Sequence, residues 1–154
     1  LVFGGGANTQ VEKNTFHQNT PVFAALSMDN FNGSTSGDFR GSALVDNQIN
    51  CGTLNCDFGI NIGPHAWYPS ANVTNGMVAR NSITGAKIGV LASGAGTVAA
   101  PVTVTGNTIV GEPAGYQSFQ CGMRPAASLV RSAVSALDTP DGAVWIISNH
   151  INCP

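Results

Sequence analysis

The chain repeats one short phrase, an asparagine followed two positions later by isoleucine or phenylalanine. The copies begin at positions 14, 47, 81, 107 and 149, so they lie 33, 34, 26 and 42 residues apart. Runs rich in Val and Ile precede most copies, as in SALVD at 42–46 and PVTVT at 101–105, and Gly residues punctuate the chain. Strand-length apolar runs at these spacings are typical of stacked-repeat architectures.

One arrangement accounts for the phrase. Each repeat forms one turn of a coil of β-strands, and each coil stacks on the last at about 4.8 Å, with Val and Ile side chains pointing inward in columns. The asparagine lies at a corner between two strands, where it tolerates left-handed backbone geometry. Because its amide both donates and accepts, it can hydrogen-bond the asparagine of the next coil. The predicted ladder comprises Asn14, Asn47, Asn81, Asn107 and Asn149.

An antiparallel β-sandwich with a turn every ten or so residues is the competing interpretation. The stretch PVTVT at 101–105 alternates as a sandwich strand would. A sandwich does not predict a recurring corner asparagine, so the stacked parallel coil is favoured.

The repeat resembles that of the right-handed parallel β-helix family, the pectate-lyase-like fold. The resemblance covers most of residues 8–111 and returns at 143–153. It implies an all-β chain of about five to six short coils, forming a single domain over 1–154 that is either complete or a fragment of a longer chain. The same scaffold hosts lyases, hydrolases, epimerases, adhesins and phage tailspikes, so the resemblance leaves the function open.

The segment PAASLVRSAVSALD at 125–138 departs from the strand pattern. Its apolar residues recur with helical spacing, and Pro125 suits the first turn of a helix. We expect an amphipathic helix here that covers an open end of the coil; a helix that binds a partner is the alternative.

Stacking the coils in register brings opposite charges together. Asp46 falls beside Arg80, and treating CGTLNC at 51–56 as an insertion places Asp57 beside Lys87. One interpretation is a pair of exposed salt bridges that help to set the register. The other is a small polar site, in which Asp46, Asp57, Arg80 and Lys87 are the catalytic candidates.

The four cysteines lack the paired spacing of a zinc site. An even count in a chain with few charges favours disulfides over free thiols. Cys51 and Cys56 would close the inserted bulge, and Cys121 and Cys153 would pin the excursion that precedes the last coil. A bridge between Cys51 and Cys153 would have to span several coils.

Composition and charge exclude several function classes. Only 9% of residues are charged, against roughly 25% in a typical domain. The net charge is -2 and no basic run occurs, so nucleic acid is not an expected partner. No apolar stretch is long enough for a membrane span.

The acidic residues are scattered, which bears on enzyme activity. Lyases of the resembled fold need clustered carboxylates for Ca²⁺ and a basic residue, and hydrolases need two or three carboxylates together. The eight acids of this chain form no such motif. We therefore expect no metal and no cofactor, and the balance is against an enzyme.

Two loops carry aromatic side chains that could bind sugar. The loop at 63–76 contains His65, Trp67 and Tyr68, and the loop at 114–122 contains Tyr116. Exposed aromatic rings stack on sugar rings; alternatively these rings fold back and bury their own surface.

The sequence thus favours a non-enzymatic structural or adhesive module, located outside the cell, on the cell surface or on a virion, with these loops as its candidate glycan-binding region. The expected partners are further copies or neighbouring subunits of a larger assembly, and polysaccharide. The alternative is a polysaccharide lyase or glycoside hydrolase, or a fragment of one.

Overall fold

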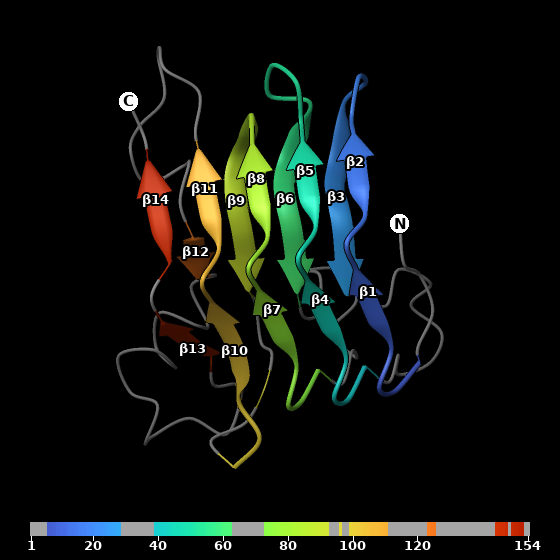
Figure 1. Cartoon of the computed structure of the whole chain (residues 1–154), viewed down its shortest axis with the longest axis vertical. Coiled ribbons are helices and arrows are strands. Elements are labelled where there is room, and N and C mark those ends of the chain that lie inside the picture. Colours follow the sequence, from blue (N-terminus) through green and yellow to red (C-terminus); the bar gives the residue numbers. More distant parts are fainter. Residues whose placement is uncertain are drawn as a thin grey trace.

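The computed structural model describes most of the first two thirds of the chain and short segments beyond it (Figure 1). The described residues are 6–28, 39–62, 73–92, 96, 99–110, 123–125, 144–147 and 149–152. All regular structure in these ranges is β-strand, and every strand pairing is parallel. The antiparallel sandwich is therefore wrong for this part of the chain.

The strands form three sheets, which we name A, B and C. Sheet A contains β1 (Gln10–Glu12), β4 (Ala43–Val45), β7 (Met77–Ala79), β10 (Val102–Thr105) and β13 (Val144–Ile147). Sheet B contains β2 (Thr15–His17), β5 (Gln48–Asn50), β8 (Ser82–Thr84), β11 (Thr108–Val110) and β14 (His150–Asn152). Sheet C contains β3 (Val22–Met28), β6 (Cys56–Ile62), β9 (Ala86–Ala92) and β12 (Met123–Pro125).

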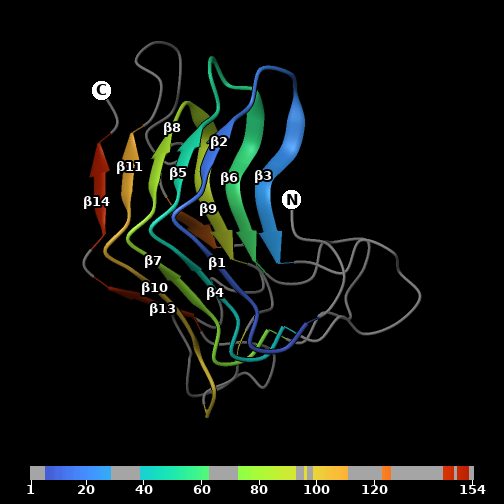
Figure 2. The ribbon, with the colours of Figure 1, turned by 45° about the vertical axis from the view of Figure 1, so that its right-hand side comes forward.

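The chain visits sheets A, B and C in turn, and each visit adds the next strand to the same side of each sheet. We call three successive strands, one from each sheet, a coil. Figure 1 shows the coils in chain order, from β1–β3 on the right to β13 and β14 on the left. Figure 2 shows sheets A and B meeting along a bend, with sheet C across the interior from them.

A column of aliphatic side chains from sheet B fills the interior. Ile49, Ile83 and Ile109 are register partners on successive strands, and each is buried. Because neighbouring side chains on a strand point to opposite faces, the residues flanking each isoleucine face outward. Burying each such side chain contributes about 1.5–3 kcal/mol. Sheet A supplies a matching buried column of Leu44, Val78 and Val104.

Sheets B and C approach closely where sheet C has glycine. A Cβ atom added to Gly59 would lie 2.5 Å from Cγ2 of Ile83, and one added to Gly89 would lie 2.5 Å from Cγ2 of Ile109. A side chain at either glycine would therefore collide with the sheet B column. The isoleucines fill the space that these glycines leave.

The corner between sheets A and B differs in one detail from the prediction. At the four corners that the structure describes, the left-handed residue is the one before the asparagine, with φ of 56° at Lys13, 56° at Asp46, 55° at Arg80 and 63° at Gly106. The preceding residue thus makes the turn. The asparagine itself is left to bridge from one coil to the next.

The predicted helix at 125–138 is wrong at its start. Pro125 ends strand β12, where it pairs with Ala92, so it does not begin a helix. Residues 123–125 form a parallel pairing with the edge of β9. This tertiary pairing outweighs the local preference of Pro for the first turn of a helix. Residues 126–138 lie outside the described residues. No helix in the described ranges is long and apolar enough to cross a membrane.

Candidate functional site

The ladder asparagines use their amides within the protein. The backbone N–H and the Nδ2 group of Asn47 both donate to Oδ1 of Asn81 at 3.0 Å, and Nδ2 also donates to the carbonyl of Val11. Asn81 repeats this with Oδ1 of Asn107 at 2.9 Å and the carbonyl of Leu44. Each central amide thus makes two donor and two acceptor bonds, so the ladder is structural and offers little to a ligand.

The ladder runs through all five predicted asparagines. Asn14 donates to Oδ1 of Asn47, and Asn107 donates to Oδ1 of Asn149 at 2.9 Å from its backbone and 2.8 Å from its side chain. Asn47, Asn81 and Asn107 are buried, whereas Asn14 is exposed.

The first charge pair is a two-pronged salt bridge. Nε of Arg80 lies 2.8 Å from Oδ1 of Asp46, and Nη2 of Arg80 lies 2.8 Å from Oδ2 of the same carboxylate. The hydrogen bond from Arg80 lowers the pKa of Asp46 below its ordinary 3.8, with help from the charges of Arg80 and Lys13 and against a smaller effect of burial. Asp46 in turn raises the pKa of Arg80. Neither group is suited to proton transfer near neutral pH, because a general acid or base needs a pKa near the working pH.

The second charge pair lies on sheet C. Nζ of Lys87 is 2.7 Å from Oδ1 of Asp57, and both side chains are about half exposed. The first pair lies at the corner between sheets A and B, so the two pairs are in different parts of the coil. The described ranges contain no group of three or more His, Cys, Asp or Glu side chains that could hold a metal ion.

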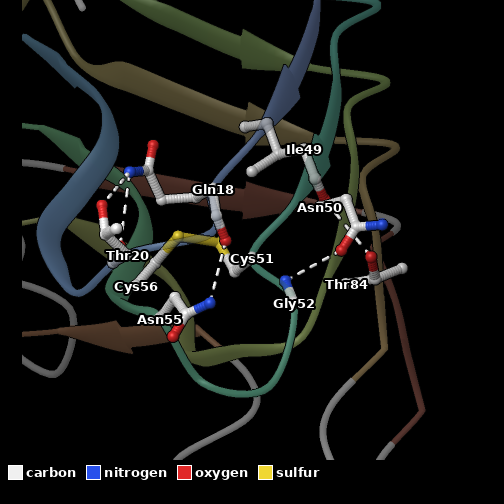
Figure 3. Close-up of a disulfide and its surroundings, with 9 residues drawn as sticks. All are labelled: Gln18, Thr20, Ile49, Asn50, Cys51, Gly52, Asn55, Cys56 and Thr84. Atoms are coloured by element: carbon white, nitrogen blue, oxygen red, sulfur yellow. Dashed lines mark hydrogen bonds between the residues drawn. A yellow bond between two sulfur atoms is a disulfide. The ribbon is translucent and has the colours of Figure 1, made fainter.

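The predicted bridge between Cys51 and Cys56 is present (Figure 3). Residues 51–55 make the connection from β5 to β6 that Gly85 alone makes from β8 to β9. The loop is held to the preceding coil by Nδ2 of Asn55, which donates to the carbonyl of Gln18 at 3.0 Å. Cys121 and Cys153 lie outside the described residues, and their pairing stays a prediction.

The outer face of sheet B carries a shallow groove of about 420 Å³ over β2, β5 and β8. Parallel sheets are usually covered on both faces, but here the outward side chains of β5 are exposed. The groove is lined by Thr15, His17, Gln48, Ile49, Asn50, Ser82 and Thr84. The described part of this lining contains no Lys, Arg, Asp or Glu, and its side-chain polar groups are hydroxyls, amides and the imidazole of His17.

Two groove side chains are oriented by the backbone near the disulfide. Oδ1 of Asn50 accepts a hydrogen bond from the backbone N–H of Gly52 at 2.8 Å. The hydroxyl of Thr84 donates to the carbonyl of Ile49 over a longer 3.4 Å. Asn50 and Thr84 are register partners on adjacent strands. The disulfide loop therefore sets the orientation of one side chain of the groove.

The groove was not predicted from the sequence. The predicted sugar-binding residues His65, Trp67, Tyr68 and Tyr116 lie outside the described residues. The signal for the groove is nevertheless present: in NTFHQ, NQINC and NSITG the residues on both sides of the apolar residue are polar. Strand alternation turns these positions to the outer face of sheet B.

No protein-family model, no curated protein and no solved structure matches the chain.

Proposed function

We propose that the chain is a right-handed parallel β-helix that serves outside the cell, on a cell surface or on a virion, as a non-enzymatic adhesive module, and that it binds glycans through the outer face of sheet B. The strand order supports the fold, because each sheet gains one parallel strand per coil. The strong preference of parallel strand connections for the right hand supports a right-handed coil.

The groove over β2, β5 and β8 is the observation that carries the proposed function. It crosses three coils, so it suits an elongated ligand that lies across the strands. Its lining presents hydroxyl, amide and imidazole groups, which can hydrogen-bond the many hydroxyl groups of a sugar chain. The predicted aromatic residues Trp67 and Tyr68 stay candidates for additional contacts.

The extracellular location is supported by the disulfide and by the composition. Disulfides persist in oxidising compartments and are rare in the cytosol. The bridge between Cys51 and Cys56 closes a loop beside the groove. A low share of charged residues, 9%, is consistent with a surface made of Asn, Thr, Ser and Gln.

Self-association is the second partner class that we propose. Strands β1, β2 and β3 each have one strand neighbour, so they are the edge strands at this end of the described part of each sheet. Such edges are templates for pairing with another chain.

Binding and turnover together test the proposed function. The chain is applied to an array of neutral and acidic oligosaccharides and is separately incubated with polysaccharides, with reducing ends and unsaturated uronates measured as products.

We expect binding without product release, and weaker binding by Gln48→Ala but not by Gln10→Ala, which makes the same change on sheet A. Product release would establish the enzyme alternative, and an array with no bound glycan would overturn the adhesive proposal.

A further inference from the structure

The hydrogen bonds of Asn50 decide what its side chain offers to a ligand. The backbone N–H of Gly52 can only donate, so the group that faces it must be Oδ1 of Asn50. This leaves the Nδ2 group, with its N–H donors, for the groove. Figure 3 shows this nitrogen directed away from the disulfide loop. Asn50 therefore acts as an oriented donor.

Thr84 is oriented in the opposite sense. The carbonyl of Ile49 can only accept, so the hydroxyl of Thr84 uses its proton in that contact. Its oxygen lone pairs remain for a ligand. Thr84 is thus an acceptor beside the donor of Asn50, and strand pairing sets the two positions about 4.8 Å apart.

A donor beside an acceptor matches a ligand hydroxyl group. A single hydroxyl accepts from Nδ2 of Asn50 and donates to Oγ1 of Thr84, and two neighbouring hydroxyls on a sugar ring can divide these roles. A carboxylate oxygen can only accept. It could accept a hydrogen bond from Nδ2 of Asn50, but its lone pairs would face the lone pairs of Oγ1 of Thr84, and this contact is repulsive.

We propose that the groove selects neutral, hydroxyl-rich glycans over acidic ones, with Asn50 and Thr84 as the selecting residues. The inference rests on the proposed glycan binding and names its ligand class. The composition of the lining agrees with it, because no Lys or Arg is among the described residues that line the groove. A polyuronate would thus find no Lys or Arg counter-charge among these residues.

The test measures the affinity of the disulfide-bonded chain for a galacturonate hexasaccharide and for its carboxyl-reduced, neutral form, together with neutral glucan, mannan and xylan hexasaccharides. Asn50→Asp keeps the acceptor for Gly52 and removes the donors; Asn19→Asp makes the same charge change outside the groove lining. Thr84→Val removes the acceptor; Thr103→Val makes the same change on sheet A. Retention of the circular dichroism of the wild type shows that each variant is folded.

We expect a neutral hexasaccharide to bind more tightly than the galacturonate form. Asn50→Asp and Thr84→Val should each weaken neutral binding about 3–10-fold, the net effect of one hydrogen bond, while the two control variants leave it unchanged. Equal or tighter binding of the acidic form, or groove variants that behave like their controls, would overturn the selectivity while glycan binding stands. If the wild type binds none of the sugars on the wider array, the proposed function itself fails.

Discussion

Single residues at the corner between sheets A and B carry two different physical roles. The buried amide of Asn81 joins three coils through bonds to Asn47, Leu44 and Asn107. The exposed side chain of Arg80, one position earlier, forms a salt bridge with Asp46. Buried hydrogen bonds are costly to break, whereas exposed ion pairs contribute little. The two positions should therefore respond very differently to substitution.

Asn81→Ala should lower the free energy of unfolding by about 3 kcal/mol or more, because it removes the four hydrogen bonds of this buried amide and leaves the backbone N–H of Asn47 without its acceptor, and a buried unsatisfied group costs about 1–3 kcal/mol. Urea denaturation followed by circular dichroism measures the change. Asn14→Ala is the matched control at the exposed end of the ladder and should cost about 1 kcal/mol or less. Equal losses at the two positions would contradict a buried ladder.

Asp46→Asn should reduce stability at pH 7 slightly, and the difference from wild type should vanish in acid. The native pKa of Asp46 is lowered by Arg80, so the carboxylate stabilises the fold above its unfolded pKa, about 4. This contribution is lost as the pH falls through the lower native pKa. Asn tolerates the left-handed φ of 56° at this position, so the backbone is not strained, and the substitution removes the negative charge together with one of the two oxygens that accept from Arg80.

Melting temperatures of the two proteins between pH 7 and pH 2 measure the effect. High salt should reduce the difference at pH 7, because the pair is exposed and screened. A difference of constant size across the pH range would show that the charge of Asp46 is not its cause.

Individual strands are matched to one another by side-chain size. Gly89 on β9 lies against Ile109 on β11, and Gly59 on β6 lies against Ile83 on β8. The surroundings of the two glycines differ in one respect. An added Cβ at Gly89 meets only side-chain atoms of Ile109 among its nearest neighbours, whereas one at Gly59 also meets the backbone oxygen of Gly89 at 2.7 Å. A backbone atom can give way less easily than a side chain.

Gly89→Ala should cost about 1–3 kcal/mol through overpacking, and Ile109→Ala should cost about 2–5 kcal/mol through a cavity. The double variant should lose less than the two together by about 1 kcal/mol or more, because the new methyl group enters the space that Ile109 vacates. Unfolding free energies of the four proteins give this coupling. The matched cycle of Gly59→Ala with Ile83→Ala should couple less, since the clash with the Gly89 carbonyl remains. Additive losses in the first cycle would contradict the close packing of sheets B and C.

The whole stack distributes its stability along the coils. Strand β8 is paired on both sides, with β5 and β11, whereas β2 has one neighbour among the described strands. Interior coils therefore lose two interfaces when they open, and an end coil loses one. The centre of the stack should open least often.

Native-state hydrogen exchange should accordingly protect the amides of β8 at least about 10-fold more than those of β2. Mass spectrometry or NMR in dilute solution measures the exchange. Protection of β2 that rises with protein concentration would indicate that another copy pairs with its edge. Equal protection of the two strands in dilute solution would contradict end-coil fraying.

The sequence by itself determined the features that depend on position along the chain. The recurring asparagine predicted the parallel stacking and the ladder, and the register derived from it paired Asp46 with Arg80, Asp57 with Lys87 and Cys51 with Cys56. Stacked coils bring residues together at nearly constant sequence intervals, so a repeat of residue type reports their contacts directly.

Only the tertiary structure decided the features that depend on contacts across the interior or on the direction of hydrogen bonds. A side chain at Gly89 would collide with Ile109, which lies on a different sheet. The register of the asparagine repeat aligns residues within one sheet and does not bring these two positions together. Pro125 belongs to strand β12 because residues 123–125 pair with the edge of β9. Local helix propensity contains no information about such a long-range pairing. The hydrogen-bonding directions of the Asn50 and Thr84 side chains in the groove could not be predicted from the sequence. They are set by bonds to the backbone of Gly52 and Ile49, and these bonds exist only in the folded chain.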